Sequence, residues 1–189
     1  MKDKVKLQAR RDAKKNKIIE SCCTAFATYG LENTTITHLC EAAKVNPKIM
    51  YDYFDSKDDI VVACAKRCIE RISSKIYKYA TSDGELLDDV KALINDYYAD
   101  REMVRFYFQA MVSPFYKEFL KDELAVLLEK HHECKVLIAE SLNKPYDVVD
   151  QIYNMAIGVI DYYCLTEDKH YIEVSYALLE RLINEELSK

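Results

Sequence analysis

The sequence predicts an all-α protein. Half of its 189 residues are apolar, only three are Gly and three are Pro, and the apolar residues recur at helical spacing along almost the whole chain. No apolar run approaches the roughly 20 residues that span a membrane, and residues 1–17 are too charged for a signal peptide. We therefore expect about nine helices and no membrane partner.

Capping residues place the first three helices. The first helix is expected over about residues 5–29, ended by Gly30 in the left-handed conformation. Thr35 is expected to cap a second helix. Asn46 is expected to cap a third, with Pro47 in its first turn, where a missing N–H does no harm. Two short helices joined by a tight turn after a longer helix predict a helix-turn-helix, a module that places one helix in the DNA major groove.

The remaining helices follow from caps, breaks and apolar spacing. Ser56 caps a fourth helix, with Asp58 and Asp59 near the positive end of its dipole. Breaks at Gly84, Pro114 and Pro145 separate the later segments. The expected helices run over about residues 57–80, 86–97, 103–111, 119–138, 146–165 and 168–186.

The charges are unevenly distributed. Residues 1–57 contain 11 Lys/Arg and 7 Asp/Glu, whereas residues 58–189 contain 16 and 25. A basic N-terminal segment in an otherwise acidic chain is typical of a segment that binds the phosphates of nucleic acid. We expect a DNA-binding domain over residues 1–57 and a second domain, for dimerisation and effector binding, over residues 58–189.

The seven cysteines are interpreted as reduced thiols of a cytoplasmic protein, because their number is odd and they lie inside helical patterns. Cys64 and Cys68 lie one helical turn apart. Together with His131, His132 and Cys134 they raise the alternative of a metal or redox sensor. Burial on an apolar stripe is the favoured interpretation, since cysteine is among the most buried residues. We expect no metal and no cofactor.

The N-terminal pattern resembles the tetracycline-repressor (TetR) family of bacterial transcriptional regulators over roughly 45 residues. The matching positions are Ile18, Ala25, Phe26, Gly30, Thr34, Thr35, Ile36, Leu39, Ala42, Ala43, Val45, Tyr51, Tyr53, Phe54, Ser56 and Lys57. One departure is Lys44, which stands where the family usually has Gly in the turn. We expect a positive φ there, with strain on the order of 1 kcal/mol.

The resemblance implies roles for the residues of this module. Hydroxyls of Thr35 and Tyr51 and the ammonium of Lys57 are expected to hold the DNA backbone. Asn46, Lys48 and Ile49 are expected to reach base edges, Lys48 through guanine O6/N7 and Ile49 through a thymine methyl. Two further residues are assigned less specifically. Thr37 suits either task, and Tyr53 either contacts a phosphate or packs as a buried ring.

The last two helices are apolar over more than one stripe, which indicates burial both within the subunit and against a partner. In the family these helices pair with their copies in a homodimer, which spaces two reading helices about 34 Å apart. Charged substitutions at Ile160 or Leu179 are expected to give monomers.

The second domain is expected to hold a small-molecule effector. Aromatic and polar side chains occur together there, although an aromatic stripe is usually core. His131 is either a hydrogen-bonded core residue or a ligand donor. The candidate lining residues are Tyr97, Phe106, Tyr107, Gln109, His131 and Tyr153.

No enzyme motif is present: there is no Gly-rich phosphate loop, no nucleophile elbow and no HExxH metal pair. The sequence therefore predicts a sequence-specific regulator of transcription, a repressor that a small molecule releases from operator DNA. Two alternatives remain. One is a DNA-binding structural or cell-division factor on the same fold, and the other is an effector-binding protein whose helix-turn-helix no longer reads DNA.

Overall fold

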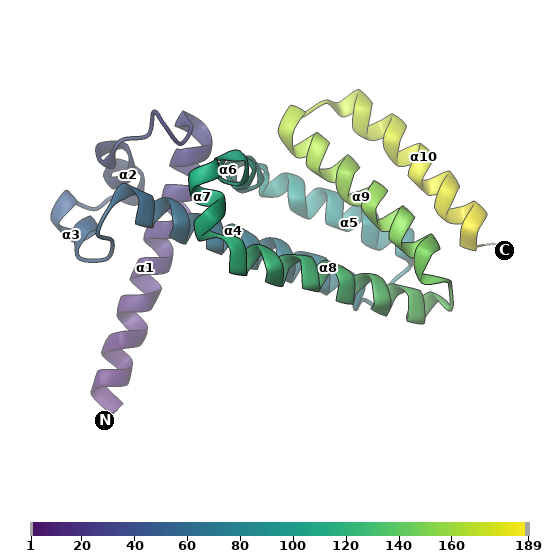
Figure 1. The fold of residues 1–189 in the computed structure, drawn as a ribbon, viewed down its shortest axis with the longest axis horizontal. Coiled ribbons are helices and arrows are strands. Elements are labelled where there is room, and N and C mark those ends of the chain that lie inside the picture. Colours follow the sequence, from purple (N-terminus) through teal and green to yellow (C-terminus); the bar gives the residue numbers. More distant parts are fainter. Residues whose placement is uncertain (1, 188–189) are drawn as a thin grey trace. The chain divides into compact units, whose positions relative to one another are not determined.

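The computed structural model describes residues 2–187, and in this range the chain forms ten α-helices and no strand (Figure 1). The all-α prediction is thus confirmed. None of the helices described is long and apolar enough to cross a membrane. The helices are α1 (Lys2–Tyr29), α2 (Ile36–Ala43), α3 (Pro47–Tyr51), α4 (Lys57–Ala80), α5 (Leu86–Ala99), α6 (Arg101–Val112), α7 (Pro114–Phe119), α8 (Lys121–Leu142), α9 (Tyr146–Thr166) and α10 (Lys169–Leu187).

The helix ends lie where local chemistry predicts them. Gly30 has φ +78° and ends α1, and the buried Thr34 donates its hydroxyl to the Gly30 carbonyl at 2.6 Å. Thr35 and Asn46 cap α2 and α3. The Ser56 hydroxyl accepts the Asp59 N–H at 3.1 Å at the start of α4. These caps satisfy backbone groups that helix termini leave free.

Residues 2–187 form ten helices rather than about nine, because an unexpected short helix, α7, lies between the expected sixth and seventh helices. Pro114 does not merely end α6; it is the first residue of the short helix α7. α7 ends at Phe119 and is followed by Leu120, whose φ of −110° and ψ of 9° leave the helical region. The Leu120 side chain is fully buried, which fixes this break. α8 then begins at Lys121, two residues later than the expected start at 119.

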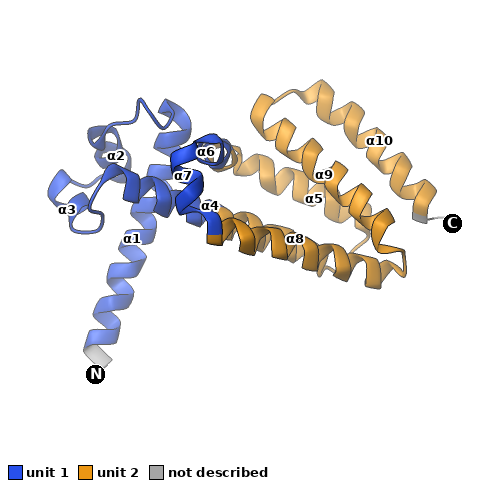
Figure 2. Cartoon of the chain, viewed as in Figure 1, with its two compact units in different colours: residues 1–68, 105–121 blue, residues 69–104, 122–189 orange. Residues whose placement is uncertain are grey.

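The chain forms two compact units (Figure 2). Unit 1 contains residues 1–68 and 105–121, and unit 2 contains residues 69–104 and 122–189. Unit 1 therefore extends beyond the expected boundary at residue 57. Helices α4 and α6 contribute residues to both units, and so does α8, whose first residue, Lys121, belongs to unit 1.

Each unit has its own apolar core. In unit 1 the rings of Phe26 and Phe106 stack with their centroids 5.3 Å apart, and Leu39 of α2 and Met50 of α3 are fully buried. In unit 2, α9 packs against α5 and α10. Leu179 and Ile183 of α10 are fully buried.

Candidate functional site

The turn between α2 and α3 is built on Lys44. Its φ of 53° and ψ of 44° confirm the predicted left-handed conformation. The Lys44 N–H donates to the carbonyls of Cys40 and Glu41, and the Val45 N–H donates to the Cys40 carbonyl at 3.0 Å. These bonds close the end of α2 and set the direction in which α3 leaves.

The start of α2 is closed by a reciprocal pair. The Thr35 hydroxyl accepts the His38 N–H at 3.3 Å, and the Thr35 N–H donates to His38 Nδ1 at 3.4 Å. His38 takes the place that Glu or Gln has in the usual capping box. Thr35 and Thr37 are both exposed, so their hydroxyls can still donate to a phosphate.

The recognition helix α3 exposes its first turn. The Asn46 side-chain oxygen accepts the Ile49 N–H at 2.9 Å, so only the amide NH₂ of Asn46 remains to meet a base. Lys48 is exposed, Ile49 is half-buried, and Tyr51 is 52% exposed. Met50, by contrast, is fully buried and packs α3 against the rest of unit 1. Lys48 is therefore an exposed cation on α3, and its contact with a base stays a prediction.

The end of α3 is braced by α1. Arg11 donates from Nη2 to the Asp52 carbonyl at 2.9 Å, and its guanidinium lies 5.4 Å from the centre of the Tyr53 ring. The Lys15 ammonium lies 5.2 Å from the centre of the Phe54 ring, which is buried. Tyr53 is half-buried, consistent with a packed ring whose hydroxyl alone can reach a phosphate. Sequence reasoning did not find the role of Arg11, because the contact joins residues 41 positions apart.

Lys57 has a structural partner. Its ammonium donates to the carbonyls of Leu31 at 2.5 Å and Glu32 at 3.3 Å. It thereby ties the first turn of α4 to the segment that follows α1. A phosphate contact by Lys57 stays a prediction, and it would use the donor capacity that these two bonds leave.

The seven cysteines are all free and buried. Cys23 of α1 lies against α4, where hydrogen bonds with Cys64 and Cys68 lower its pKa. The Cys64 thiol donates to the Ile19 carbonyl at 3.5 Å, and burial raises its own pKa. Among residues 2–187 no three His, Cys, Asp or Glu side chains are arranged to hold a metal ion.

Unit 2 contains an apolar cavity of about 70 Å³ between α4, α5, α8 and α9. Its wall is almost entirely aliphatic. Two tyrosines on the wall have their hydroxyls engaged: Tyr79 donates to Asp96 at 2.6 Å, and the Tyr153 hydroxyl lies 2.8 Å from His131 Nδ1. The charged lining residues are Asp89 and Lys144. The cavity therefore favours an apolar ligand, because it offers few free hydrogen-bonding groups to a polar one.

Of the six residues predicted to line a ligand cavity, only Tyr153 lies on this wall. His131 is its hydrogen-bond partner, and burial together with the nearby Lys135 lowers the His131 pKa. Tyr97 is 2% exposed and borders a second space of only about 10 Å³. The other three, Phe106, Tyr107 and Gln109, belong to unit 1.

Their places in unit 1 differ. Phe106 is a core residue stacked on Phe26, and Tyr107 contacts the edge of Phe108 with centroids 5.3 Å apart. The Gln109 oxygen is buried without a hydrogen-bond partner among the described residues. The actual wall residues, such as Ile76, Leu93 and Ile152, carry ordinary core spacing. No sequence signal separates them from core.

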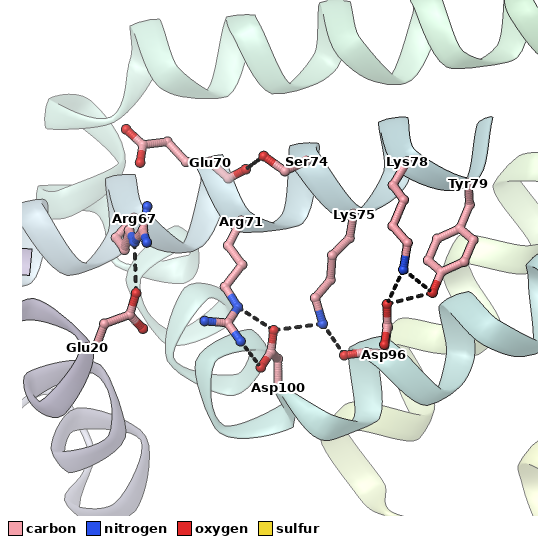
Figure 3. A network of polar contacts seen from close by, with 10 residues as sticks. All are labelled: Glu20, Arg67, Glu70, Arg71, Ser74, Lys75, Lys78, Tyr79, Asp96 and Asp100. Atoms are coloured by element: carbon pink, nitrogen blue, oxygen red, sulfur yellow. Dashed lines mark hydrogen bonds and ion pairs between the residues drawn. The ribbon is translucent and has the colours of Figure 1, made fainter. Parts of the chain in front are cut away.

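A polar network joins α4 to α5 within unit 2 (Figure 3). Arg71 donates to both carboxylate oxygens of Asp100, from Nε at 2.5 Å and Nη2 at 2.6 Å, and the Lys75 ammonium lies 2.8 Å from the same carboxylate. Lys75 also donates to the Asp96 carbonyl. Farther along, the Tyr79 hydroxyl and the Lys78 ammonium, at 3.3 Å, hold the Asp96 carboxylate and lower its pKa.

This geometry can be compared with known proteins. Residues 18–64 match the sequence profile described as "Bacterial regulatory proteins, tetR family". No curated protein matches the sequence.

Solved structures resemble the chain over most of its length. PfmR, a TetR family transcriptional regulator from Thermus thermophilus, has a TM-score of 0.65 at 16% identity and covers 88% of this chain and 97% of its own. FadR from Bacillus subtilis, in complex with stearoyl-CoA, has a TM-score of 0.64 at 16% identity, with 88% and 96% covered. The multidrug binding protein EbrR, complexed with malachite green, has a TM-score of 0.61 at 15% identity, with 88% and 96% covered. Residues 18–64 are thus the N-terminal domain of the tetR family of bacterial regulatory proteins, and the chain has the fold of TetR-family transcription regulators.

Proposed function

We propose that the protein is a sequence-specific, DNA-binding regulator of transcription in the cytoplasm, released from its operator by a small apolar molecule. The observation that carries the DNA-binding part is the match of residues 18–64, in which α3 exposes Lys48 beside the capped Asn46. Lys48 reads a base edge, and Thr35, Thr37 and Tyr51 hold the phosphates on either side.

The dimer interface is proposed on α9 and α10. Four large apolar side chains of these helices are 44–55% exposed in the single chain: Tyr162, Leu165, Val174 and Leu178. Ile160 and Leu179, which the sequence suggested as interface residues, are 1% and 0% exposed and belong to the core of unit 2. A charge at either would unfold the subunit, so Val174 and Leu178 are the residues that test the interface.

The effector site is proposed in the cavity of unit 2. Two proteins of similar fold were solved with a ligand bound. FadR is in complex with stearoyl-CoA, and EbrR is in complex with malachite green. An apolar cavity of about 150 Å³ holds benzene, so a cavity of about 70 Å³ must widen to take most effectors.

Widening would displace α4, which supplies Ile76 and Tyr79 to the wall. The same helix begins at Lys57 in unit 1. A ligand that binds better when α4 is displaced lowers the affinity for DNA, and DNA lowers the affinity for the ligand by the same factor. That factor is about 5–150-fold for a coupling free energy of 1–3 kcal/mol.

The experiment is selection of bound duplexes from a random-sequence DNA library, followed by binding measurements on the enriched sequence. We expect a two-fold symmetric sequence with half-sites about one helical turn apart. Lys48→Ala should lower affinity for it by about 1–3 kcal/mol and relax one base position. If no sequence is enriched, the protein is not a sequence-specific regulator. Repression is tested by placing the enriched sequence at a reporter promoter.

A further inference from the structure

The first half of α1 is a separate feature of unit 1. Residues 4–17, which we name the basic arm, contain seven Lys/Arg and one acid, Asp12, in a protein whose net charge is −5. All of these residues except Lys15 are exposed, and burial begins only at Ile18. The basic arm also precedes the first residue that matches the tetR family profile. Nothing in the proposed reading by α3 uses it.

The cations of the basic arm share one side of the helix. At 100° per residue, all seven fall within about 180° of the helix circumference, whereas Asp12 lies on the opposite side. The contacts of Arg11 with Asp52 and Tyr53, and of Lys15 with the Phe54 ring, turn one edge of this basic side toward the end of α3. The basic side and the reading helix are therefore neighbours within one compact unit.

Most of these cations have no protein partner. The side chains of Lys4, Lys6, Arg10, Lys14 and Lys17 make no hydrogen bond or ion pair with any of residues 4–186, whose side chains the structure describes. Lys6, Arg10 and Lys14 are spaced four residues apart, where like charges destabilise a helix. A helix of this composition is stabilised by an external polyanion.

We infer that the basic arm binds the phosphates of DNA that flanks the segment read by α3. Fourteen residues of helix extend about 21 Å, and duplex DNA carries one negative charge per about 1.7 Å of its axis. Several phosphates therefore lie within the length of the arm. This inference rests on the proposed DNA binding, and it adds a contact that carries no sequence preference.

An anionic membrane surface is the competing partner, and the apolar residues argue against it. Val5 and Leu7 are the only large apolar side chains between residues 4 and 17, and both are well exposed. They point about 160° apart on the helix. A helix that lies in a membrane interface needs a continuous apolar face. The basic arm has the positive charge that an anionic membrane attracts, but it lacks the apolar face that would insert into the membrane.

The test uses the full chain and a random-sequence DNA duplex of about 40 base pairs, because phosphate contacts need no operator. The variant replaces Lys6, Arg10 and Lys14 by Gln, which keeps the helix propensity. The control variant removes three exposed cations from unit 2, at Lys91, Lys169 and Arg181, by the same change. Affinity is measured over a series of salt concentrations.

Each phosphate contact contributes about 0.9 to the slope of log K against log salt. We expect the arm variant to flatten the slope by about 1–3 per bound protomer and to weaken binding at least about ten-fold near 0.1 M salt. The control variant should keep the wild-type slope. Far-UV circular dichroism checks that both variants remain helical.

Three outcomes would overturn the inference. One is an arm variant with the slope and affinity of the wild type. Another is a control variant that flattens the slope equally, which would assign the effect to overall charge. The third is unchanged DNA binding together with lost binding to phosphatidylserine vesicles. A wild-type protein that binds no duplex at any salt concentration would instead reject the proposed function itself.

Discussion

The ion pairs around Asp100 should contribute most of the polar stability of unit 2. The Asp100 side chain is 16% exposed and holds two cations, the Arg71 guanidinium through two bonds and the Lys75 ammonium, which is itself 18% exposed. Asp100→Asn keeps the shape and removes the charge. It leaves Lys75 largely buried without its carboxylate.

The size of the effect follows from burial. Removing one partner of a fully buried pair costs about 3–5 kcal/mol, and an exposed pair contributes about 0–1 kcal/mol. Arg71 is 41% exposed, so its share is discounted for solvent screening. We expect Asp100→Asn to lower the free energy of unfolding by about 2–3 kcal/mol.

The matched control is Lys78→Gln at the far end of the same network. That pair joins Lys78, 64% exposed, to Asp96, 41% exposed, at 3.3 Å. Its loss should affect stability far less than the loss of the Asp100 carboxylate, because solvent screens exposed charges. Urea unfolding at pH 7 compares the two variants, and a double-mutant cycle between Arg71 and Asp100 isolates their coupling. Equal costs for Asp100→Asn and Lys78→Gln would refute the ranking by burial.

Four further outcomes are expected. Relative to Lys44→Ala, Lys44→Gly should be neutral or should stabilise the protein by up to about 1 kcal/mol, because the φ of 53° at this position suits glycine. A lower melting temperature for Lys44→Gly than for Lys44→Ala would contradict this. Lys48→Ala should reduce operator affinity far more than random-DNA affinity in titrations of both. Leu178→Glu should give folded monomers by light scattering with weakened operator binding, whereas a persisting dimer would move the interface elsewhere. Burial raises the Asp161 pKa to about 7, so the contribution of Asp161 to stability falls as pH rises from about 4 to 7; relative to wild type, Asp161→Asn should stabilise by up to about 4 kcal/mol above pH 7 and hardly at all near pH 4, as measured by unfolding at both.

The features that the sequence predicted are those set by local chemistry. Thr35, Asn46 and Ser56 each bond to an N–H three residues ahead, so spacing alone locates them. The left-handed conformation of Lys44 was expected from the resemblance, because Lys44 stands where the family usually has Gly. α7 was missed because Pro114 both ends one helix and begins another, and the buried Leu120 that separates α7 from α8 is a tertiary feature.

The cavity could not be predicted, because it depends on tertiary packing and not on local chemistry. Its wall takes residues from four helices, and each residue there has the spacing of ordinary core. The aromatic residues that suggested a ligand site serve other ends: Phe106 fills unit 1, and Tyr97 fills unit 2. Whether packing leaves a space depends on how helices meet, which periodicity does not encode.

Unit 1 is built from two separate stretches of the chain, and this affects the design of chimaeras in which DNA-binding modules are exchanged between proteins of this fold. Because residues 105–121 complete the unit, its coding sequence is interrupted by that of residues 69–104, which belong to unit 2. A chimaera that transfers only residues 1–68 would leave the Phe26 ring without Phe106 and open a hole in the core the size of an aromatic side chain, a loss of about 3–5 kcal/mol. A transplanted DNA-binding module should therefore bring residues 105–121 with it, which include Phe106 and all of α7, and a fragment that ends before them should be degraded or aggregate rather than bind DNA.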